Sequence, residues 1–387
     1  MASASGTTVA RDPNQAHRAA TTLELFFDLV SVIAIAAVTA GFHHAISEGH
    51  GLEALPRFVF LFLAIWWAWM NFTWFASAFD NDDKVFRILV MVIMGGELLF
   101  AGGATHIFET LDFSFGLLGW IIMRLAMVTL WFRVAKGDAT YRKTAIRYAI
   151  GIAFAQLCWT VFYFATEPAS LAFYLLGCLC FLIEWAVPPY AESAKMTPFH
   201  RHHIIERYGL LMIISLGEVV LSVSHGFSYL FSDHPEPAVA IVSVSALVIV
   251  FAIWWVYFCE AEHLPRRAMK TALVWGYGHV FVFMATAALG AAISASIDVA
   301  THHAHASQSD VSRWLGASLS LGAIGLWVIR DQFLPLSTGR RIALPIMALV
   351  FAGAGLLGLP VAAFAGLALV MVVWRAPETG NTPTGPA

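Results

Sequence analysis

Several ionisable residues of this sequence stand inside long apolar stretches, where an unpaired charge costs several kcal/mol if the stretch spans a bilayer. Glu24 and Asp28 are four residues apart, so they share one face of a helix. Two carboxylates this close do not both ionise without a cation or a basic partner. The spacing therefore predicts a cation or proton site. The alternative is that Glu24 caps its helix while Asp28 pairs with a basic residue such as Arg207.

A second acid and a histidine occupy corresponding deep positions in the two halves of the chain. Glu97 follows Gly95 and Gly96, and His279 follows Gly278. Glycines allow helices to approach closely, and a glutamate and a histidine can share a proton near neutral pH. The same pattern fits a purely structural hydrogen bond that joins the halves.

Arg124 and Glu218 are the remaining deep charges. At a rise of 1.5 Å per residue, Arg124 should lie roughly 12 Å into its helix from the outer side. Glu218 should lie about 18 Å along its helix from Glu206. We expect an acidic partner for Arg124, either Glu97 or Glu218. The arginine could hold an anionic substrate, or it could form one half of a structural ion pair.

Together these side chains predict a polar centre for a transported solute or ion. In this hypothesis the carboxyl groups of Glu97 and Glu218 exchange protons, while the imidazole and the guanidinium adjust their proton affinity. The predicted site residues are Asp28, Glu97, Arg124, Glu206, Glu218 and His279.

A tryptophan-rich segment occurs twice. Trp66 and Trp67 recur as Trp254 and Trp255 in a similar apolar setting. The simplest interpretation is that all four pack the protein core. Because the faces of indole rings attract cations, they could instead line a site for a cation or a flat ligand.

The elements that must position these groups are membrane helices. The chain has 387 residues, of which 59% are hydrophobic and 12% are charged, whereas soluble domains carry about 25% charged residues. A formal net charge of -3, without a basic patch beyond short flanking loops, excludes a nucleic-acid partner. The composition predicts an all-α polytopic membrane protein in contact with the lipid bilayer.

Apolar run lengths predict the number of spans. A spanning helix needs roughly 20 mostly apolar residues. The last tract, from Arg340 to Arg375, is interrupted at Gly358-Leu359-Pro360 and should form a hairpin of two short helices. With this hairpin the sequence predicts twelve transmembrane helices. The other ten lie near 23–46, 55–79, 85–107, 116–135, 144–165, 169–187, 204–227, 238–260, 270–295 and 312–330.

Basic residues predict the orientation. With twelve spans, one side of the membrane receives every Lys and Arg except Arg57, Arg124 and Arg313. Since basic residues favour the cytoplasmic side, both termini should be cytoplasmic.

The spans divide into two similar halves. The acidic segment Leu23–Asp28 returns as Ile205–Leu210, and a tryptophan-rich helix follows each copy. Six is an even number, so the halves should be parallel repeats related by an axis along the membrane normal. The expected organisation is a polar tail (1–22), a first six-helix repeat (23–190), a cytoplasmic linker (191–203), a second repeat (204–375) and a flexible tail (376–387).

Three motifs resemble the bacterial low-temperature requirement A (LtrA) family. They are Leu23–Val30, Phe79–Asp83, and Glu206–Gly209 together with Leu216–Glu218. The resemblance covers nearly the whole chain and implies a bacterial inner-membrane protein with a role in growth at low temperature. It implies no particular biochemical activity. Ser31 stands where the family usually has a bulkier, aromatic continuation.

The first helix is also similar to that of lysosomal and bacterial potassium channels built from six-helix repeats. Those channels carry a Phe-Ser-Asp motif, and this chain has Phe26-Phe27-Asp28. The second half has Leu210 in place of the aspartate, so half of that pore motif is absent.

Two other functional classes stay open. Outer histidines such as His302, His303 and His305 could bind a metal in a membrane enzyme, although no cysteine or carboxylate completes a defined ligand set. A non-transporting sensor or scaffold would have a dry interior with every buried charge paired. Because no nucleophile elbow, phosphate-binding loop or zinc-protease helix occurs, we expect no enzymatic activity, no cofactor and no metal. A homo-oligomer is compatible with the sequence.

Overall fold

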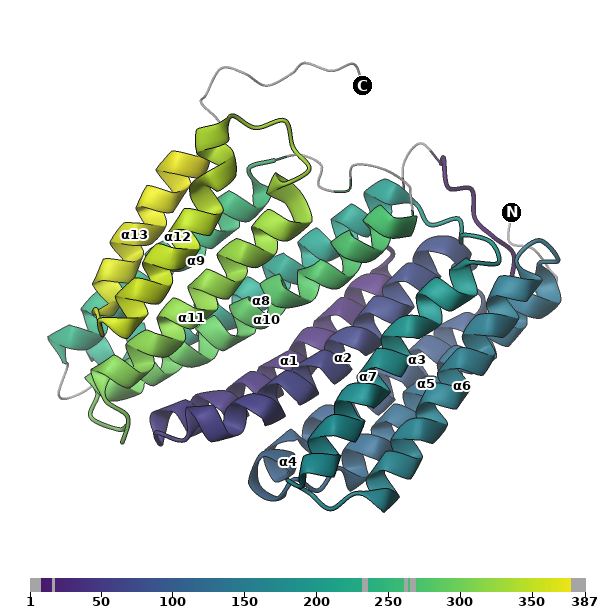
Figure 1. The fold of residues 1–387 in the computed structure, drawn as a ribbon, viewed down its shortest axis with the longest axis horizontal. Coiled ribbons are helices and arrows are strands. Elements are labelled where there is room, and N and C mark those ends of the chain that lie inside the picture. The colour runs from purple at the N-terminus through teal and green to yellow at the C-terminus, as the bar shows by residue number, and fades with distance from the viewer. Residues whose placement is uncertain (1–7, 16–17, 232–235, 261–263, 265–268, 377–387) are drawn as a thin grey trace. The chain divides into compact units, whose positions relative to one another are not determined.

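The computed structural model describes residues 8–15, 18–231, 236–260, 264 and 269–376, and all the regular secondary structure in these residues is helical (Figure 1). Apolar runs of this length form helices because a helix satisfies its own backbone hydrogen bonds inside a bilayer. A 3-10 turn (Tyr229–Phe231) follows α8, and a π-helical turn (Trp327–Asp331) follows α11. The α-helices are α1 (Thr22–Ser47), α2 (Gly51–Phe79), α3 (Lys84–Gly102), α4 (Ala104–Thr110), α5 (Ser114–Gly137), α6 (Arg142–Ala165), α7 (Leu171–Glu192), α8 (Arg201–Ser228), α9 (Pro237–Phe258), α10 (Met269–Ala300), α11 (Gln308–Leu326), α12 (Thr338–Leu356) and α13 (Val361–Arg375).

Eleven helical segments in the described part of the chain are long and apolar enough to cross a membrane. The remaining apolar helix, α13, has 15 residues, fewer than the roughly 20 that a span needs. The predicted break in the last apolar tract is confirmed, because α12 ends at Leu356 and α13 begins at Val361. The all-α multi-span class is therefore confirmed, and the twelfth span stays a prediction.

The chain divides into two compact units. Unit 1 comprises Met1–Gly41, Ala54–Leu211 and Arg266–Leu273, and unit 2 comprises Phe42–Glu53, Met212–Pro265 and Val274–Ala387. The arrangement of residues 23–190 and 204–375 as parallel repeats stays a prediction.

In unit 1, α3, α5, α6 and α7 pack in order, each against the next. The backbones of α3 and α5 come close at Gly96 and Gly119: a Cβ on Gly96 would lie 2.7 Å from the carbonyl oxygen of Gly119. Small residues permit such an approach between membrane helices. This crossing bears on the site because Glu97 directly follows Gly96, and Arg124 lies on α5 a little beyond Gly119.

In unit 2, α11 packs against α12, and α13 packs against both α12 and α9. Two glycines again permit a close approach, since a Cβ on Gly355 would lie 2.9 Å from the carbonyl oxygen of Ser312 and 3.2 Å from Cα of Gly316. The π-helical turn after α11 carries Arg330 and Asp331, which are both fully buried. Such turns change the direction in which the following side chains project.

Candidate functional site

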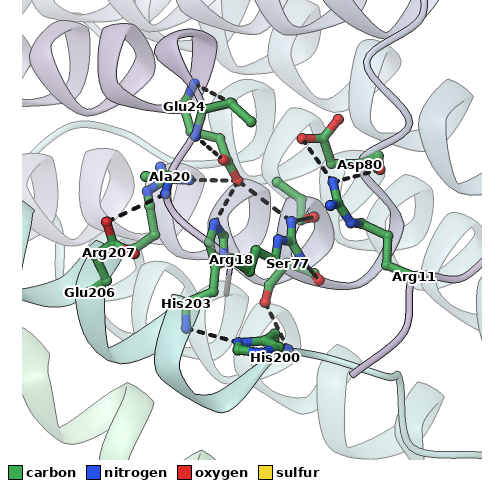
Figure 2. A network of polar contacts seen from close by, with 12 residues as sticks. Arg11, Arg18, Ala20, Glu24, Ser77, Asp80, His200, His203, Glu206 and Arg207 are labelled. Atoms are coloured by element: carbon green, nitrogen blue, oxygen red, sulfur yellow. Dashed lines mark hydrogen bonds and ion pairs between the residues drawn. The ribbon is translucent and has the colours of Figure 1, made fainter. Parts of the chain in front are cut away.

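The first candidate site lies in unit 1, where α1 and α8 begin. Arg207 donates two hydrogen bonds to Asp28, from Nε to Oδ2 (3.0 Å) and from Nη2 to Oδ1 (2.6 Å). Its Nη1 lies 3.2 Å from Glu24 Oε1, and Figure 2 shows the two residues among their polar neighbours. All three side chains are fully buried. One guanidinium therefore binds two carboxylates, which its planar fork of N–H donors favours.

His203 and Trp69 supply further donors to the same carboxylates. His203 Nε2 lies 3.1 Å from Glu24 Oε1, and Trp69 Nε1 donates to Asp28 Oδ1 at 2.6 Å. Both side chains are fully buried. These contacts bring together one group of ionisable residues, which we call the N-terminal cluster: Arg18, Glu24, Asp28, His203 and Arg207.

Glu24 also caps α1. Thr21 N donates to Glu24 Oε2 at 2.8 Å, and Glu24 N donates to Thr21 Oγ1 at 3.2 Å, which is the reciprocal geometry of a capping box. The alternative derived from the sequence is thus confirmed in both parts: Glu24 caps its helix, and Asp28 pairs with Arg207.

The segment before α1 ties the N-terminal cluster to the end of α2 (Figure 2). Arg18 donates to the carbonyl oxygens of Ala76, at 2.7 Å, and of Ser77, and it lies 4.0 Å from Glu24. The last carbonyls of a helix lack partners in that helix and carry partial negative charge, so an arginine satisfies both needs. Burial lowers the pKa of the Arg18 guanidinium to about 10, and the group stays charged at neutral pH.

Asp80 carries a buried carboxyl group and lies just beyond α2, in the short loop that joins α2 to α3. Its Oδ1 accepts a hydrogen bond from Asp82 N at 2.8 Å, and Arg11 Nη1 lies 3.8 Å from its Oδ2. Burial, together with the negative charge of Glu24, raises the pKa of Asp80 to about 6. This loop therefore contains a carboxyl group that titrates close to neutral pH.

Glu97, on α3, is fully buried in unit 1. Ser31 Oγ donates to its Oε2 at 3.1 Å. Within the described residues, Oε1 has no hydrogen-bond partner, and no arginine, lysine or histidine stands within ion-pairing distance of the carboxyl group. Burying an ionised carboxylate without a cation costs several kcal/mol. The surroundings thus compensate the negative charge of an ionised Glu97 far less than they compensate the charges of Glu24 and Asp28.

Arg124, on α5, forms an ion pair with Glu184 on α7. Arg124 Nη2 lies 3.0 Å from Glu184 Oε1, and Trp67 Nε1 donates to Glu184 Oε2 at 2.9 Å. The guanidinium also lies over the ring of Trp120, 5.2 Å from its centroid. Both members of the pair are buried.

The partner expected for Arg124 was wrong. We predicted Glu97 or Glu218, and the structure instead pairs Arg124 with Glu184. Helix–helix contacts explain the difference, because α5 and α7 both pack against α6 in the same bundle. Glu184 stands inside an apolar tract without any motif around it, so no sequence signal distinguished it as a partner for Arg124.

The four predicted lining tryptophans fall into two groups. Trp66 and Trp67, on α2, are 1% and 0% exposed, whereas Trp254 and Trp255, on α9, are 48% and 54% exposed. The expectation that the second pair packs the core is therefore wrong, and a lining role for the four rings stays a prediction. Similar sequence does not fix which side of a helix is buried.

Glu206 and Glu218 are not enclosed like the other predicted acids. Glu206 is exposed at the start of α8, where Ala20 N donates to its Oε1 at 3.4 Å. Its neighbour Arg207 takes the buried position instead. Glu218 is half-buried in unit 2.

His279, on α10 in unit 2, is fully buried. Its Nδ1 lies 2.7 Å from the carbonyl oxygen of Trp275, so this nitrogen carries the proton, and Nε2 accepts from the Tyr257 hydroxyl at 3.2 Å. Tyr257 also lines a small internal cavity of unit 2 together with Thr286 and Ser318.

Asp28 and Glu97 are the two buried acids among the predicted site residues that the structure brings into one neighbourhood, and the exposed Glu206 lies beside it, next to Arg207. Both are linked to α1, since Ser31, three residues after Asp28, donates to Glu97. Arg124 binds elsewhere in unit 1, and Glu218 and His279 belong to unit 2. A single centre formed by all six residues, and the proton shared between Glu97 and His279, stay predictions.

Sequence analysis did not single out a second cluster, which lies in unit 2. We call it the C-terminal cluster: Glu260, Arg330, Asp331, Arg340 and Arg375. Arg375 donates to both Asp331 oxygens (2.5 and 2.9 Å) and to Glu260 (2.8 Å). Arg330 donates to Asp331 at 2.7 Å and, at 2.5 and 3.1 Å, to the last carbonyls of α9. The adjacent Arg330-Asp331 pair at a helix end was the available signal.

Two histidines that the sequence predicts on the outer side pair with carboxylates. His43 Nε2 lies 2.7 Å from Asp298 Oδ2, and His305 Nδ1 lies 2.7 Å from Glu48 Oε2. Across the residues that the structure describes, no group of three His, Cys, Asp or Glu side chains is close enough together to hold a metal ion.

Comparisons with known proteins place the chain in a bacterial family. The family model described as bacterial low temperature requirement A protein (LtrA) matches residues 19–376. A protein of Rhizobium meliloti (strain 1021), named as uncharacterized, is 24% identical over 271 residues, an alignment that covers 66% of this chain and 64% of that protein. No solved structure matches the chain.

Proposed function

The chain belongs to the bacterial low temperature requirement A (LtrA) family, and on that premise we propose that it is a transporter or channel-like protein of the inner membrane. Its solute is a small polar molecule or ion, and the movement of that solute is linked to protons. Both termini lie in the cytoplasm, and the protein has no enzymatic activity.

The observation that carries this proposal is the surroundings of Glu97. A fully buried acid with a serine hydroxyl as its hydrogen-bond partner, and with no cation beside it in the described residues, is costly to retain inside a membrane bundle. A group that gains and loses a proton during transport gives that cost a purpose. Intramembrane carboxyl groups serve as proton relays in many pumps and transporters.

The polar face of α1 supports a route to Glu97. Glu24, Asp28 and Ser31 follow one another at intervals of four and three residues, so they form a line on one side of the helix. Seven residues span about 10 Å at 1.5 Å per residue. The line begins at the capped end of α1 and ends at the hydrogen bond from Ser31 to Glu97. In this proposal, protons pass along this line from the predicted cytoplasmic side.

A non-transporting scaffold is the competing class, and the two clusters favour it. Both hold their carboxylates in contact with arginines, as a structural role requires. The flux assay below separates the two classes.

We test the proposal with full-length protein in liposomes that contain a pH-sensitive dye. A panel of inorganic cations, inorganic anions, amino acids and small carboxylates is added outside, one at a time. At least one solute should change the internal pH faster than in protein-free liposomes. The Glu97→Gln variant should abolish that change, since its amide carries no transferable proton.

Glu109→Gln is the matched control, because the same substitution there affects an exposed side chain of α4. It should behave as the wild type. Wild-type liposomes that respond to no solute would favour the scaffold, and unchanged flux in Glu97→Gln would remove this residue from the mechanism.

A further inference from the structure

A buried ion pair stands near the middle of unit 1. Arg124 is ten residues beyond Ser114, the start of α5, which places it about 15 Å along that helix at 1.5 Å per residue. A hydrocarbon core is about 30 Å thick. Arg124 and Glu184 expose only 3% and 1% of their surfaces. A buried ion pair contributes little to stability compared with apolar packing, so its presence at this depth needs another reason.

Several buried hydrogen-bonding atoms of this pair lack a partner of normal geometry. In the described part of the chain these atoms are Arg124 Nε, Arg124 Nη2 and Glu184 Oε1, although Nη2 and Oε1 lie 3.0 Å apart. The same holds for the indole N–H groups of Trp120 and Trp159, whose rings lie 4.8 Å apart. The indole of Trp159 faces Glu184, and Trp67 already occupies Oε2 of that carboxylate. Two donors, Arg124 Nε and the Trp120 indole N–H, are thus left without an acceptor in this part of the chain, and such buried donors indicate a guest that accepts hydrogen bonds.

The carboxylate that now faces Arg124 indicates which kind of ligand could replace it. The guanidinium of Arg124 faces a carboxylate, a group that its planar fork of donors matches. A second anion beside the intact pair would leave a net negative charge in the interior, which is costly. Neutrality is restored when Glu184 takes up a proton and Arg124 turns to the guest.

We propose that this group, the Arg124 site, binds a small monocarboxylate together with one proton. The site consists of Arg124, Glu184, Trp67, Trp120 and Trp159. The inference rests on the proposed transport function and names its substrate class. In the empty site, Arg124 pairs with ionised Glu184. In the occupied site, the proton resides on Glu184 and the substrate carboxylate faces Arg124, so both states are neutral and the net cargo is the uncharged acid.

Few other groups influence the titration of Glu184. The titratable or charged side chains that face it, in the described residues, are Arg124 on α5, Cys158 on α6 and Cys180 on α7 itself. The side chain from α2 that contacts Glu184 is the Trp67 indole, which does not titrate. Thiols ordinarily titrate near pH 8.5. Below that pH, the proton taken up with the substrate is therefore assigned to Glu184.

Formate, the smallest monocarboxylate, is the probe. Calorimetric titration of full-length wild-type protein in detergent, in two buffers of different ionisation enthalpy, counts the protons taken up with each formate. We expect one proton. While Glu184 is ionised in the empty protein, the affinity should fall about tenfold for each unit of rising pH. Chloride at equal concentration should cause no such uptake. Absent formate binding, or binding without proton uptake, overturns the proposal.

Two variants locate the site. Glu184→Gln has no charge at any pH and leaves Arg124 without a counter-ion, so formate should bind it tightly and without pH dependence. Arg124→Gln should lose formate binding. Glu167→Gln, which alters an exposed glutamate before α7, is the matched control and should bind formate as the wild type does. If a site variant fails to fold, the proton count of the wild type decides alone. Wild-type binding by Arg124→Gln would place the anion elsewhere and overturn the proposal.

The two proposals can fail separately, because calorimetry requires no transport. Proton-linked flux of another solute, with no formate binding, would refute the substrate class and preserve the transport function. Formate binding with proton uptake, in a protein that shows no flux, would preserve the site and refute transport.

Discussion

Two arginine–carboxylate clusters, one in each unit, satisfy the end of a tryptophan-rich helix in the same way. In unit 1, Arg18 donates to the last carbonyls of α2, and in unit 2, Arg330 donates to those of α9. Each arginine also lies beside a carboxylate, Glu24 in the first case and Asp331 in the second. The requirement is general: terminal helix carbonyls lack donors, and apolar surroundings supply no water.

The clusters differ in how far they are closed to solvent. Glu24, Asp28 and Arg207 are fully buried in the N-terminal cluster. In the C-terminal cluster, the side chains of Glu260 and Arg340 are 22% and 29% exposed. Water can replace a lost partner at a partly exposed carboxylate, whereas a sealed carboxylate has no substitute. Similar contacts should therefore contribute differently to stability.

The largest expected effect tests this difference directly. Arg207→Leu removes a fully buried cation from Glu24 and Asp28 and should cost about 3–5 kcal/mol of unfolding free energy. Arg375→Leu should cost less, about 1–3 kcal/mol, because Asp331 keeps its hydrogen bond from Arg330 and because water can reach the partly exposed Glu260. Denaturant titration of both purified variants, followed by tryptophan fluorescence, measures the losses. Equal losses would mean that neither the retained Arg330 bond nor the exposure of Glu260 reduces the effect of removing Arg375.

Asp80 provides a pH-dependent probe of stability close to the N-terminal cluster. Its pKa is raised by burial from 3.8 to about 6 in the folded protein, so the folded state binds more protons than the unfolded state between these values. Stability should therefore fall as pH rises through this window. Asp80→Asn should remove the fall and stabilise the protein above pH 6 by up to about 3 kcal/mol, at 1.36 kcal/mol per pKa unit.

Asp82→Asn is the control for this experiment, because its expected effect on stability has the opposite sign. The hydrogen bond from Arg87 lowers the pKa of Asp82, so removing that carboxylate should weaken the protein slightly at neutral pH. Melting temperatures of the two variants and the wild type, measured from pH 4 to pH 8, show whether each substitution stabilises or destabilises the protein. A neutral-pH loss for Asp80→Asn would show that its contact with Arg11 outweighs the cost of burial.

The sequence predicted the helices well because hydropathy is a local property. α2 extends the predicted span 55–79 by four residues at its start, and α8 extends the predicted span 204–227 by three residues at its start and one at its end. The break before Val361 was also predictable, since glycine and proline interrupt helices wherever they occur together. None of these features depends on a distant part of the chain.

Ion-pair partners on different helices were predictable only where the sequence offered few oppositely charged candidates. Arg207 as the alternative partner of Asp28 followed from one arginine near a predicted helix start. Glu184 as the partner of Arg124 did not, since it depends on the rotation of α5 and α7 within the bundle. The prediction that Trp254 packs the core was wrong for the same reason, because its resemblance to Trp66 carries no information on which helix face is buried.

The smallest expected effect concerns the two capping boxes, one in each unit. Thr21 caps α1 next to the sealed cluster, and Ser307 caps α11 at an exposed position. Replacing either with alanine should cost about 1 kcal/mol. Their coupling to Arg207→Leu should differ: Thr21 acts through Glu24, so its double variant should deviate from additivity, whereas Ser307 has no shared partner with Arg207 and should be additive. A double-mutant cycle measures both terms. Additivity at Thr21 would mean that Glu24 caps α1 independently of the cluster, and the sealed network would then be smaller than its contacts imply.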